Sequence, residues 1–407
     1  MMSLLFALML AQSPREPVEA LPGAGRLPDH AATAARRSAL MARMGRGVAI
    51  VRAGTSRDLE VDVLQDNDFR ADDTFFYLTG LETPDAVLVL ATRPDEAFLL
   101  LPARNPQQER WTGPRLGPGP EATRWSGVPT LSVASLDSLV AALVARSGAV
   151  REVGPAVDSM RVYKDADEVA RLQRAIDITG EAHLAAMRAA RPGLFEYQVE
   201  AVIEGTFRDR GADRVGFPSI VGSGPNATTL HYDWNRRRMD AGDLIVIDIG
   251  AEWGQYSADI TRTIPVSGTF TPRQKAIYDL VLATQQAAID AVRPGVTVAD
   301  LNRIARTYMQ ANSGTLCGDG GCGQYWIHGL AHWLGMRVHD VGDYNLLLAA
   351  GAVLTIEPGI YLPGEGFGVR IEDDILVTTT GHEVLSGRIP RTTADIERIM
   401  REGGSND

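Results

Sequence analysis

Short apolar runs and stretches with helical spacing alternate along the first third of the chain. A helical pattern at 31–45 precedes the runs, and another at 135–146 follows them. The runs in between predict strands, and they lie at 48–51, 75–78, 86–91 and 97–101. This alternation predicts a small α/β domain, which we place at 31–155.

The pattern changes after a break near residues 148–163, where a long amphipathic helix is predicted at 165–190. Its apolar positions include Ile176 and Met187, which lie on one stripe of the helix. His183 lies on the same stripe. We therefore interpret it as a core histidine and assign it no function.

An internal repeat organises the rest of the chain. Residues 185–193 align with 287–295, and each copy ends a helix at Arg-Pro-Gly, which is a common helix stop. A second helix follows in each copy, because apolar residues recur at matching positions after both stops. The matching pairs are Val199 and Leu301, Val202 and Ile304, Ile203 and Ala305, and Phe207 and Met309.

Each copy then carries two acids in strand-like sequence. The apolar run 244–247 leads directly into Asp248 and predicts a strand that is buried on both faces. In both copies one acid, Asp248 or Glu357, comes six residues after the glycine of an Ala-Gly pair. A second acid follows on the next predicted strand of each copy, Asp259 in the first and Glu372 in the second. A carboxylate in such a strand must be paired, hydrogen-bonded or bound to a metal.

Two related α-α-β-β halves with a pseudo-two-fold axis are therefore predicted for residues 160–395, in a protein of the α+β class. The four acids should meet where the halves join. Four carboxylates cannot share a dry site as anions, because their charges repel one another and force protonation. Multivalent cations remove that conflict, so the pattern indicates a two-metal site.

A histidine would complete such a site, and four are available near the acids. His328 and His332 are four residues apart and would share one face if their segment were helical. His231 and His339 lie eleven and twelve residues before the glycines of the two copies. Spacing alone does not choose among these four histidines.

Composition narrows the classes of function. A chain of 407 residues can form two domains with full hydrophobic cores. A net charge of −11, without a basic stripe that could neutralise phosphates, argues against nucleic-acid binding. No segment reaches the roughly 18 apolar residues of a membrane span.

The chain ends and the cysteines bear on localisation. Residues 1–30 are interpreted as a signal-like segment and a linker, although no Lys or Arg precedes the apolar stretch at 3–11. Residues 396–407 are interpreted as a polar tail. Cys317 and Cys322 would form a disulfide in an exported protein and stay reduced in a cytosolic one. Together these features slightly favour a periplasmic or secreted protein.

Five motifs carry a resemblance to the metal-dependent proline peptidases, the aminopeptidase P and prolidase group. Their pita-bread fold is shared with creatinase and methionine aminopeptidase. The motifs are LHY at 230–232, DIGAEWGQYSADITRT at 248–263, HGLAHWLGMRVHDVG at 328–342, EPGIY at 357–361 and VRIEDD at 369–374. The first domain resembles the N-terminal domain of aminopeptidase P at residues 69–90 and 109–118.

The resemblance implies a set of metal ligands: Asp248, Asp259, His332, Glu357 and Glu372. They would bind two divalent ions per chain, with Mn²⁺ favoured and Co²⁺, Zn²⁺ or Fe²⁺ as alternatives. In this family pattern Asp259 and Glu372 bridge the two ions, and His332 contacts one of them. The resemblance thus selects the histidine that spacing left open.

The resemblance also implies roles around the ions. Glu357 relays a proton, and His231 and His339 donate hydrogen bonds to the substrate carbonyl. Arg370 holds a bridging carboxylate, although an Arg two residues from an acid is usually a simple ion-pair partner. His328 and Tyr361 match substrate-binding positions at the rim of the site, and Tyr361 has core packing as its alternative.

The leading function is an Xaa-Pro aminopeptidase that acts on peptides with proline in second position. An Xaa-Pro dipeptidase (prolidase) with the same site is the nearest alternative, and a metal-free binding module on this fold is the alternative from another class. Methionine aminopeptidase is disfavoured, because that group generally lacks the first domain. A homo-oligomer, dimer or tetramer, is expected through the first domain.

Overall fold

The structure is a computed structural model that describes residues 28–55 and 69–403. Residues 1–27 of the predicted signal-like segment and linker, and residues 404–407 of the predicted tail, lie outside this description. The chain divides into two compact units, Met1–Val153 and Gly154–Asp407. The domains that we place at 31–155 and 160–395 correspond to these units in order along the chain.

The first unit is built on one mixed sheet. Its strands are β1 Val48–Arg52, β2 Val87–Ala91, β3 Glu96–Leu101 and β4 Thr130–Ser132, hydrogen-bonded in that order. The first two pairings are antiparallel, and β3 pairs with β4 in parallel. The helical segments are α1 His30–Met44, α2 Asp73–Thr79, α3 Pro106–Thr112, α4 Pro120–Ser126, η1 Val133–Ser135 and α5 Leu136–Ser147.

One strand prediction in this unit is wrong. Residues 75–78, which we predicted as a strand, belong to helix α2. The side chain of Asp72 caps the helix by accepting hydrogen bonds from the backbone N–H groups of Thr74 and Phe75, and Gly80 ends it with a left-handed backbone, φ 69°. A short apolar run that is buried all round has no period that distinguishes strand from helix, so the capping residues decide here.

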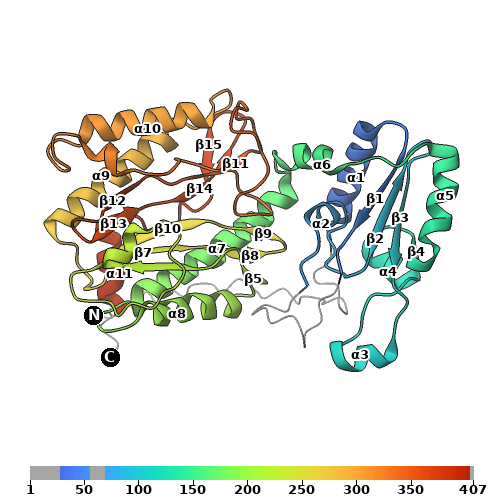
Figure 1. Ribbon diagram of the computed structural model, residues 1–407, viewed down its shortest axis with the longest axis horizontal. Helices are drawn as coiled ribbons and strands as arrows, with labels where there is room; N and C mark the ends of the chain where they lie inside the picture. Colours follow the sequence, from blue (N-terminus) through green and yellow to red (C-terminus); the bar gives the residue numbers. More distant parts are fainter. Residues whose placement is uncertain (1–27, 56–68, 404–407) are drawn as a thin grey trace, which may run out of the picture. The chain divides into compact units, whose positions relative to one another are not determined.

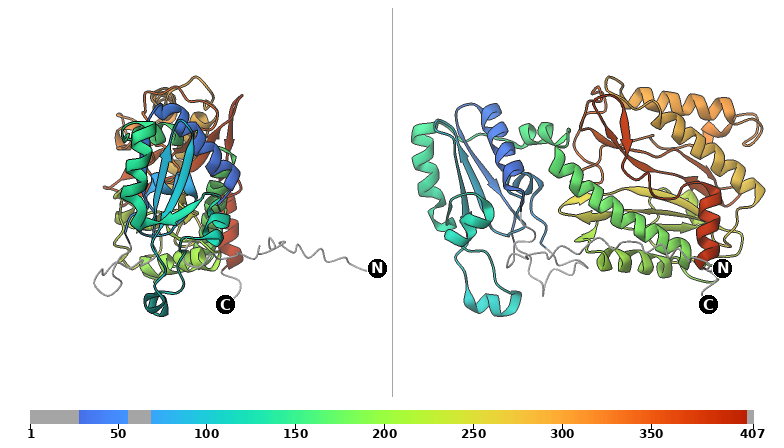
Figure 2. Two further views of the ribbon diagram at one scale, coloured as in Figure 1. Left: turned by 90° about the vertical axis from the view of Figure 1, so that its right-hand side faces the viewer. Right: turned by 180° about the vertical axis from the view of Figure 1, so that it is seen from behind.

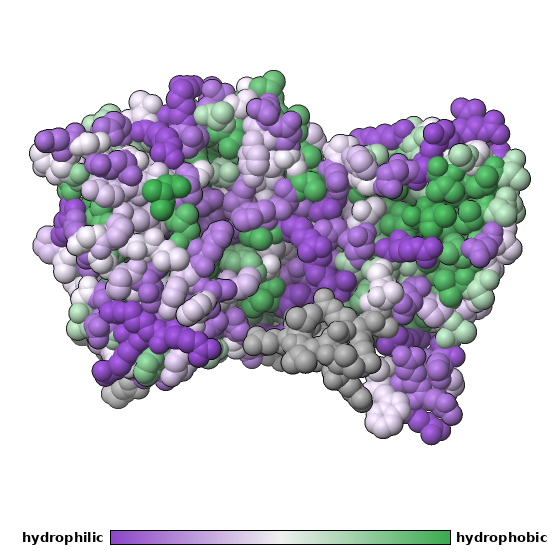
Figure 3. Space-filling model, viewed as in Figure 1, coloured by the Kyte–Doolittle hydropathy of each residue, from purple (hydrophilic) through white to green (hydrophobic). Residues whose placement is uncertain are grey.

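Apolar side chains gather on one face of the first unit, where the space-filling view is green (Figure 3). In the same unit, partly buried hydrophobic residues pack against a small core that includes Val48, Val89 and Leu143. They are Ile50, Phe98, Leu131, Val133, Leu136, Leu139 and Val144.

The second unit contains the repeated helix pairs. In the first half these are α7 Ala166–Ala189 and α8 Glu196–Asp209, and in the second half α9 Pro272–Ile289 and α10 Val298–Asn312. Helix α7 packs against strands of the first half, and α9 packs against strands of the second half (Figure 1). The predicted α+β class with two α-α-β-β halves is therefore confirmed.

Three antiparallel strands form a sheet in each half. In the first half, β7 Leu244–Ile249 pairs with both β10 Ile260–Pro265 and β6 Ile220–Ser223. In the second half, β14 Asp373–Val377 pairs with both β11 Val353–Ile356 and β15 His382–Val384. The short strands and 3-10 helices of the unit are β5 Arg214–Val215, β8 Ala251–Trp253, β9 Tyr256–Ser257, β12 Gly359–Leu362, β13 Phe367–Arg370, η2 Gly224–Thr228 and η3 Cys322–Tyr325.

A hairpin therefore stands between the two acids of each half. The β8–β9 hairpin separates Asp248 from Asp259, and the β12–β13 hairpin separates Glu357 from Glu372. Both hairpins return the chain to the antiparallel partner of the strand that it left. The two acids of each half, although separated along the chain, therefore lie at the same end of two paired strands.

Two further segments differ from the predictions. The break near 148–163 contains helix α6 Gly154–Arg161. The prediction of a polar tail at 396–407 is corrected, because helix α11 Thr393–Gly403 includes the first residues of this segment. Ile396, Ile399 and Met400 are buried on its inner face, and α11 (red) lies beside α7 (Figure 2). Apolar spacing of three and four residues gives this charged segment one face that packs.

Three smaller predictions can now be compared with the structure. His183 is fully buried with Nε2 2.9 Å from the Ile260 carbonyl oxygen, and burial lowers its pKa to about 3, so it is a core histidine. Cys317 and Cys322 form a disulfide in the loop after α10. Among the described residues, no helix combines the length and apolar character that a membrane span requires.

Candidate metal centre

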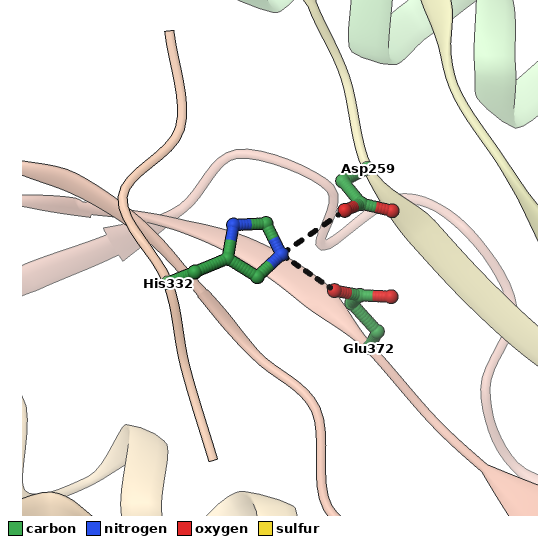
Figure 4. A group of neighbouring side chains, drawn as sticks. All are labelled: Asp259, His332 and Glu372. Carbon is green, nitrogen blue, oxygen red and sulfur yellow. Dashed lines mark ion pairs between the residues drawn. The ribbon is translucent and has the colours of Figure 1, made fainter. Parts of the chain in front are cut away.

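Asp259, His332 and Glu372 converge in the interior of the second unit (Figure 4). His332 Nε2 lies 3.2 Å from Asp259 Oδ2 and 3.9 Å from Glu372 Oε1. Each acid comes directly before a strand, Asp259 before β10 and Glu372 before β14. The backbone N–H of Glu372 donates to the Thr261 carbonyl oxygen at 3.1 Å, so the two halves meet at this cluster.

The other two predicted ligands belong to the same group. His332 Nε2 lies 3.7 Å from Glu357 Oε1, and Glu357 follows the last residue of β11. Asp248 is on β7, directly opposite Thr261 of β10. The structure therefore brings together all five residues that the resemblance selected.

The segment that carries His332 is not helical. Residues 328 and 332 would share a face only in a helix, and this condition is not met. The segment instead runs along β11, with a bridge between Trp333 and Leu354. Two hydrogen bonds join His332 to Thr355. The backbone N–H of Thr355 donates to the His332 carbonyl oxygen at 3.0 Å, and the backbone N–H of His332 donates to Thr355 Oγ1 at 3.1 Å. His332 Nδ1 lies 3.1 Å from the Trp333 carbonyl oxygen, which leaves Nε2 directed at the acids.

Three of the four acids are strongly perturbed by their surroundings. Burial, then the neighbouring carboxylates, raise the pKa values of Asp259 and Glu372 well above their ordinary range. Burial raises the pKa of Glu357 to about 8. Without a counter-charge, these groups would hold protons at neutral pH.

Asp248 differs because it has a cation. Burial alone would raise its pKa, but the Arg370 guanidinium and hydrogen bonds from Asp259 and Thr261 hold the pKa below its usual value. Arg370 Nη2 donates to Asp248 Oδ2 at 2.7 Å. The same guanidinium donates to Tyr361 Oη at 2.9 Å, so Tyr361 is linked to the cluster through a hydrogen bond.

The donor set fits divalent metal ions. Oδ1 of Asp248 and Oδ1 of Asp259 are buried and have no hydrogen-bond partner among the described residues. An unsatisfied buried carboxylate oxygen is costly, and a cation would satisfy it. Hard carboxylate oxygens with one imidazole nitrogen are typical ligands of Mn²⁺, Fe²⁺, Co²⁺ and Zn²⁺. The described part of the chain therefore contains a candidate metal site at Asp259, His332 and Glu372.

The remaining predicted histidines surround the cluster. The His339 ring lies 4.4 Å from the His332 ring and 6.5 Å from the His231 ring, measured between centroids. Both His231 and His339 are exposed. Burial and the neighbouring His231 lower the pKa of His339, so it is neutral at pH 7. His328 Nε2 lies 2.8 Å from Tyr361 Oη.

Sequence reasoning missed several residues that position the acids. Thr261 Oγ1 donates to Glu372 Oε2 at 2.7 Å, and Asp374 Oδ2 accepts from the backbone N–H of Asp259 at 3.3 Å. Both contacts cross between the halves. Their only sequence signal is position: Thr261 lies two residues after Asp259, and Asp374 two after Glu372. Without the strand register, neither could be assigned a partner.

Known proteins match both units. The sequence profile described as metallopeptidase family M24 matches residues 170–379, and the profile described as the aminopeptidase P N-terminal domain matches residues 33–151. The Xaa-Pro aminopeptidase of Haemophilus influenzae is 35% identical over 84% of this chain and 91% of that protein. The Xaa-Pro aminopeptidase of Escherichia coli is 33% identical over 90% of this chain and 96% of that protein.

Solved structures agree with these matches. Zn-substituted aminopeptidase P of E. coli, in complex with product, superposes with a TM-score of 0.85 at 32% identity, covering 92% of this chain and 99% of that chain. Proline aminopeptidase P II of Yersinia pestis superposes with a TM-score of 0.82 at 34% identity, covering 92% and 100%. The chain therefore belongs to metallopeptidase family M24, with the pita-bread fold, and within that family to the Xaa-Pro aminopeptidases.

Proposed function

We propose that this chain is an Xaa-Pro aminopeptidase, a hydrolase that releases the first residue of peptides whose second residue is proline. The observation that carries the proposal is the gathering of three carboxylates from both halves, Asp259, Glu357 and Glu372, within 3.9 Å of His332 Nε2. Relatives that match this chain over most of their own length carry this name. The peptide is thus the expected substrate.

The proposed metal ligands are Asp248, Asp259, His332, Glu357 and Glu372. Four carboxylates and one imidazole offer enough donor atoms for two divalent ions, which supports two ions per chain. Mn²⁺ is the favoured ion, with Co²⁺, Zn²⁺ and Fe²⁺ as alternatives. When bound, such ions polarise a carbonyl oxygen and lower the pKa of water.

Glu357 is the proposed proton relay. It lies within 3.7 Å of His332 Nε2 and 3.6 Å of His328 Nδ1, between the buried cluster and the rim. From there it can take a proton from water and deliver it to the proline nitrogen that leaves.

The exposed histidines are the proposed substrate contacts. His231 and His339 lie at the rim with their rings facing the same region, and each can donate a hydrogen bond to the oxygen of the scissile carbonyl. His328 and Tyr361 form the linked pair at 2.8 Å that we assign to substrate binding. The expected contact of Arg370 with a bridging carboxylate is corrected to Asp248, because its guanidinium donates to Asp248 and to Tyr361 and so orients both.

Two substrates separate this proposal from its alternatives. We expect purified protein loaded with Mn²⁺ to release the first residue of an Xaa-Pro-Xaa tripeptide, and to lose that activity in a chelator. Cleavage of an Xaa-Pro dipeptide without cleavage of the tripeptide would favour a prolidase instead. A protein that binds less than one ion per chain and cleaves neither peptide would be a binding module.

Oligomerisation and export also stay proposals. The apolar face of the first unit supports association of two or four copies through that unit (Figure 3). Light scattering of the purified protein measures the number of copies. The Cys317–Cys322 disulfide supports a periplasmic or secreted protein. N-terminal sequencing of the mature protein, with a start near Gln12 or Ser13, would support export.

A further inference from the structure

His231 is carried by a segment with little regular backbone structure. Between η2, which ends at Thr228, and β7, which begins at Leu244, the described chain forms no helix or strand apart from a single bridge between Phe195 and Arg238. His231 itself is exposed. Its position therefore depends on the hydrogen bonds of its neighbours in the segment.

The carboxylate of Glu196 accepts two hydrogen bonds from this segment and three more from residues just before it. It is the first residue of α8 and has no exposed surface. Oε1 accepts hydrogen bonds from the backbone N–H and the hydroxyl of Ser223, both at 2.7 Å, and from Asn226 Nδ2 at 3.1 Å. Oε2 accepts from Tyr232 Oη and from the backbone N–H of Arg237, both at 2.8 Å. One carboxylate thus binds residues 223–237 at four points along the chain.

The donors explain why a carboxylate is required. All five groups are uncharged, whereas the Arg237 guanidinium pairs with Asp243 and Asp240 at 2.5 and 2.9 Å. Only a carboxylate accepts with both of its oxygens, while the amide of glutamine would point a donor at two of these groups. The N-terminus of α8 also favours the negative charge, which offsets part of the cost of burying it.

A second anchor lies on the other side of His231. The Leu230 carbonyl oxygen accepts a hydrogen bond from Arg370 Nη2 at 3.3 Å, and the same nitrogen donates to Asp248 Oδ2 at 2.7 Å. The residue after His231, Tyr232, is held by Glu196 through its hydroxyl. His231 is therefore fixed between one neighbour tied to the acid cluster and one tied to Glu196.

We propose that Glu196 is a positioning residue for His231 and that it acts through the Tyr232 hydroxyl. This inference rests on the proposed function, because that function assigns a substrate contact to His231. Glu196 fixes the segment so that the imidazole stays at the rim opposite His339, 6.5 Å away, without contact between Glu196 and the substrate.

The test is a double-mutant cycle with Tyr232→Phe, which removes one hydroxyl and leaves the ring. Tyr232→Phe is expected to lower kcat/KM about tenfold, the loss that one hydrogen bond gives, with unchanged metal content. In the His231→Ala background the same substitution should change kcat/KM by less than about twofold. Glu196→Gln should lose at least as much activity as Tyr232→Phe.

Tyr197→Phe is the matched control on the same helix. Its side chain is 47% exposed and stacks on Phe195, so its loss of a hydroxyl should leave kcat/KM unchanged. If the losses of Tyr232→Phe and His231→Ala multiply, or if Tyr232→Phe has full activity, the inference is overturned.

A crystal structure of the Tyr232→Phe variant decides the same question without an assay. We expect the His231 ring to move away from its place opposite His339 or to lose defined density. A ring that stays in place would overturn the inference. Failure of the wild-type protein to cleave Xaa-Pro peptides would instead reject the proposed function, and the two failures are thereby distinguished.

Discussion

The buried acid cluster and the exposed histidine rim are positioned in different ways. The acids of the cluster are on strands or directly beside them, and the pairing of β7 with β10 and of β11 with β14 sets their places. His231 and His339 are in irregular segments, where individual side-chain hydrogen bonds replace a repeating ladder. Sheet register thus fixes the cluster, whereas the rim depends on anchors such as Glu196.

The two regions also differ in charge. The cluster concentrates carboxylates whose pKa values are raised by burial, while the pKa of His339 is lowered by burial and by His231. Substitution of an acid in the cluster should therefore change both metal binding and stability. Substitution of a histidine in the rim should change only the rate of peptide cleavage. Each prediction below tests one side of this division.

The largest effect is expected for Glu372→Gln, which keeps the shape of the side chain and removes its charge. We expect metal content to fall and kcat/KM to drop by more than about 100-fold, because even outer partners of metal ligands cost 10–100-fold. In a chelator at pH 8, the variant should melt at or above the wild-type temperature, because the folded wild type must take up a proton on Glu372 and the amide needs none. Asp209→Asn, at an acid that is 65% exposed, is the control.

A variant that binds metal and reacts like the wild type would show that Glu372 is not a ligand. Lower stability in the chelator would show that its charge does not destabilise the metal-free cluster. Either result would blur the contrast between the cluster and the rim.

A smaller effect is expected at the rim for His339→Ala. Removing one donor to a developing oxyanion costs about 100-fold in kcat, and the metal content should stay as in the wild type. The expected measurement is a lower kcat with unchanged ion stoichiometry by elemental analysis. His382→Ala, in strand β15 of the same unit, is the control for loss of an imidazole. If the His339→Ala variant lost its metal, His339 would belong to the metal-binding cluster and not to the rim.

The smallest effect is a pH dependence of the metal-free protein. The folded-state pKa of Glu357 is about 8 against an ordinary value of 4.5, so between these pH values the folded state binds more protons than the unfolded state. Stability must then fall as pH rises through this window. Melting temperatures in a chelator should drop by several degrees between pH 5 and pH 8.

With Mn²⁺ the trend should reverse, because metal binding releases the same protons and strengthens as pH rises. A Glu357→Gln variant in chelator should show a flatter curve than the wild type. Melting curves without any pH dependence from pH 5 to pH 8 would contradict the raised pKa of Glu357.

The sequence could predict the cluster better than the rim, for the same physical reason. The apolar run before Asp248 and the repeated helix stops can be recognised in the sequence, because burial and the end of a helix each favour particular residues. The choice of His332 required the resemblance, since its segment has no period. The anchors of the rim, such as the bond from Tyr232 to Glu196, join residues 36 positions apart and leave no local signal.

Short helices show the same limit. The apolar run at 75–78 is too short to show a helical or strand period. In α11 the apolar positions 396, 399 and 400 lie among charged residues, so the segment resembles a polar tail. Both are decided by contacts that the chain makes only when folded, the caps of α2 and the packing of α11 on α7.

The two hairpins between the acids suggest different tolerance to engineering. The turn of the β12–β13 hairpin is exposed at residues 363–365, and its Glu365 forms only a surface ion pair with Arg273 at 2.6 Å. The turn of the β8–β9 hairpin contains Gln255, which has no exposed surface. A tag or fluorescent label grafted at Gly364 should therefore leave the flanking acids Glu357 and Glu372 in place, whereas a graft at Gly254 would disrupt the interior.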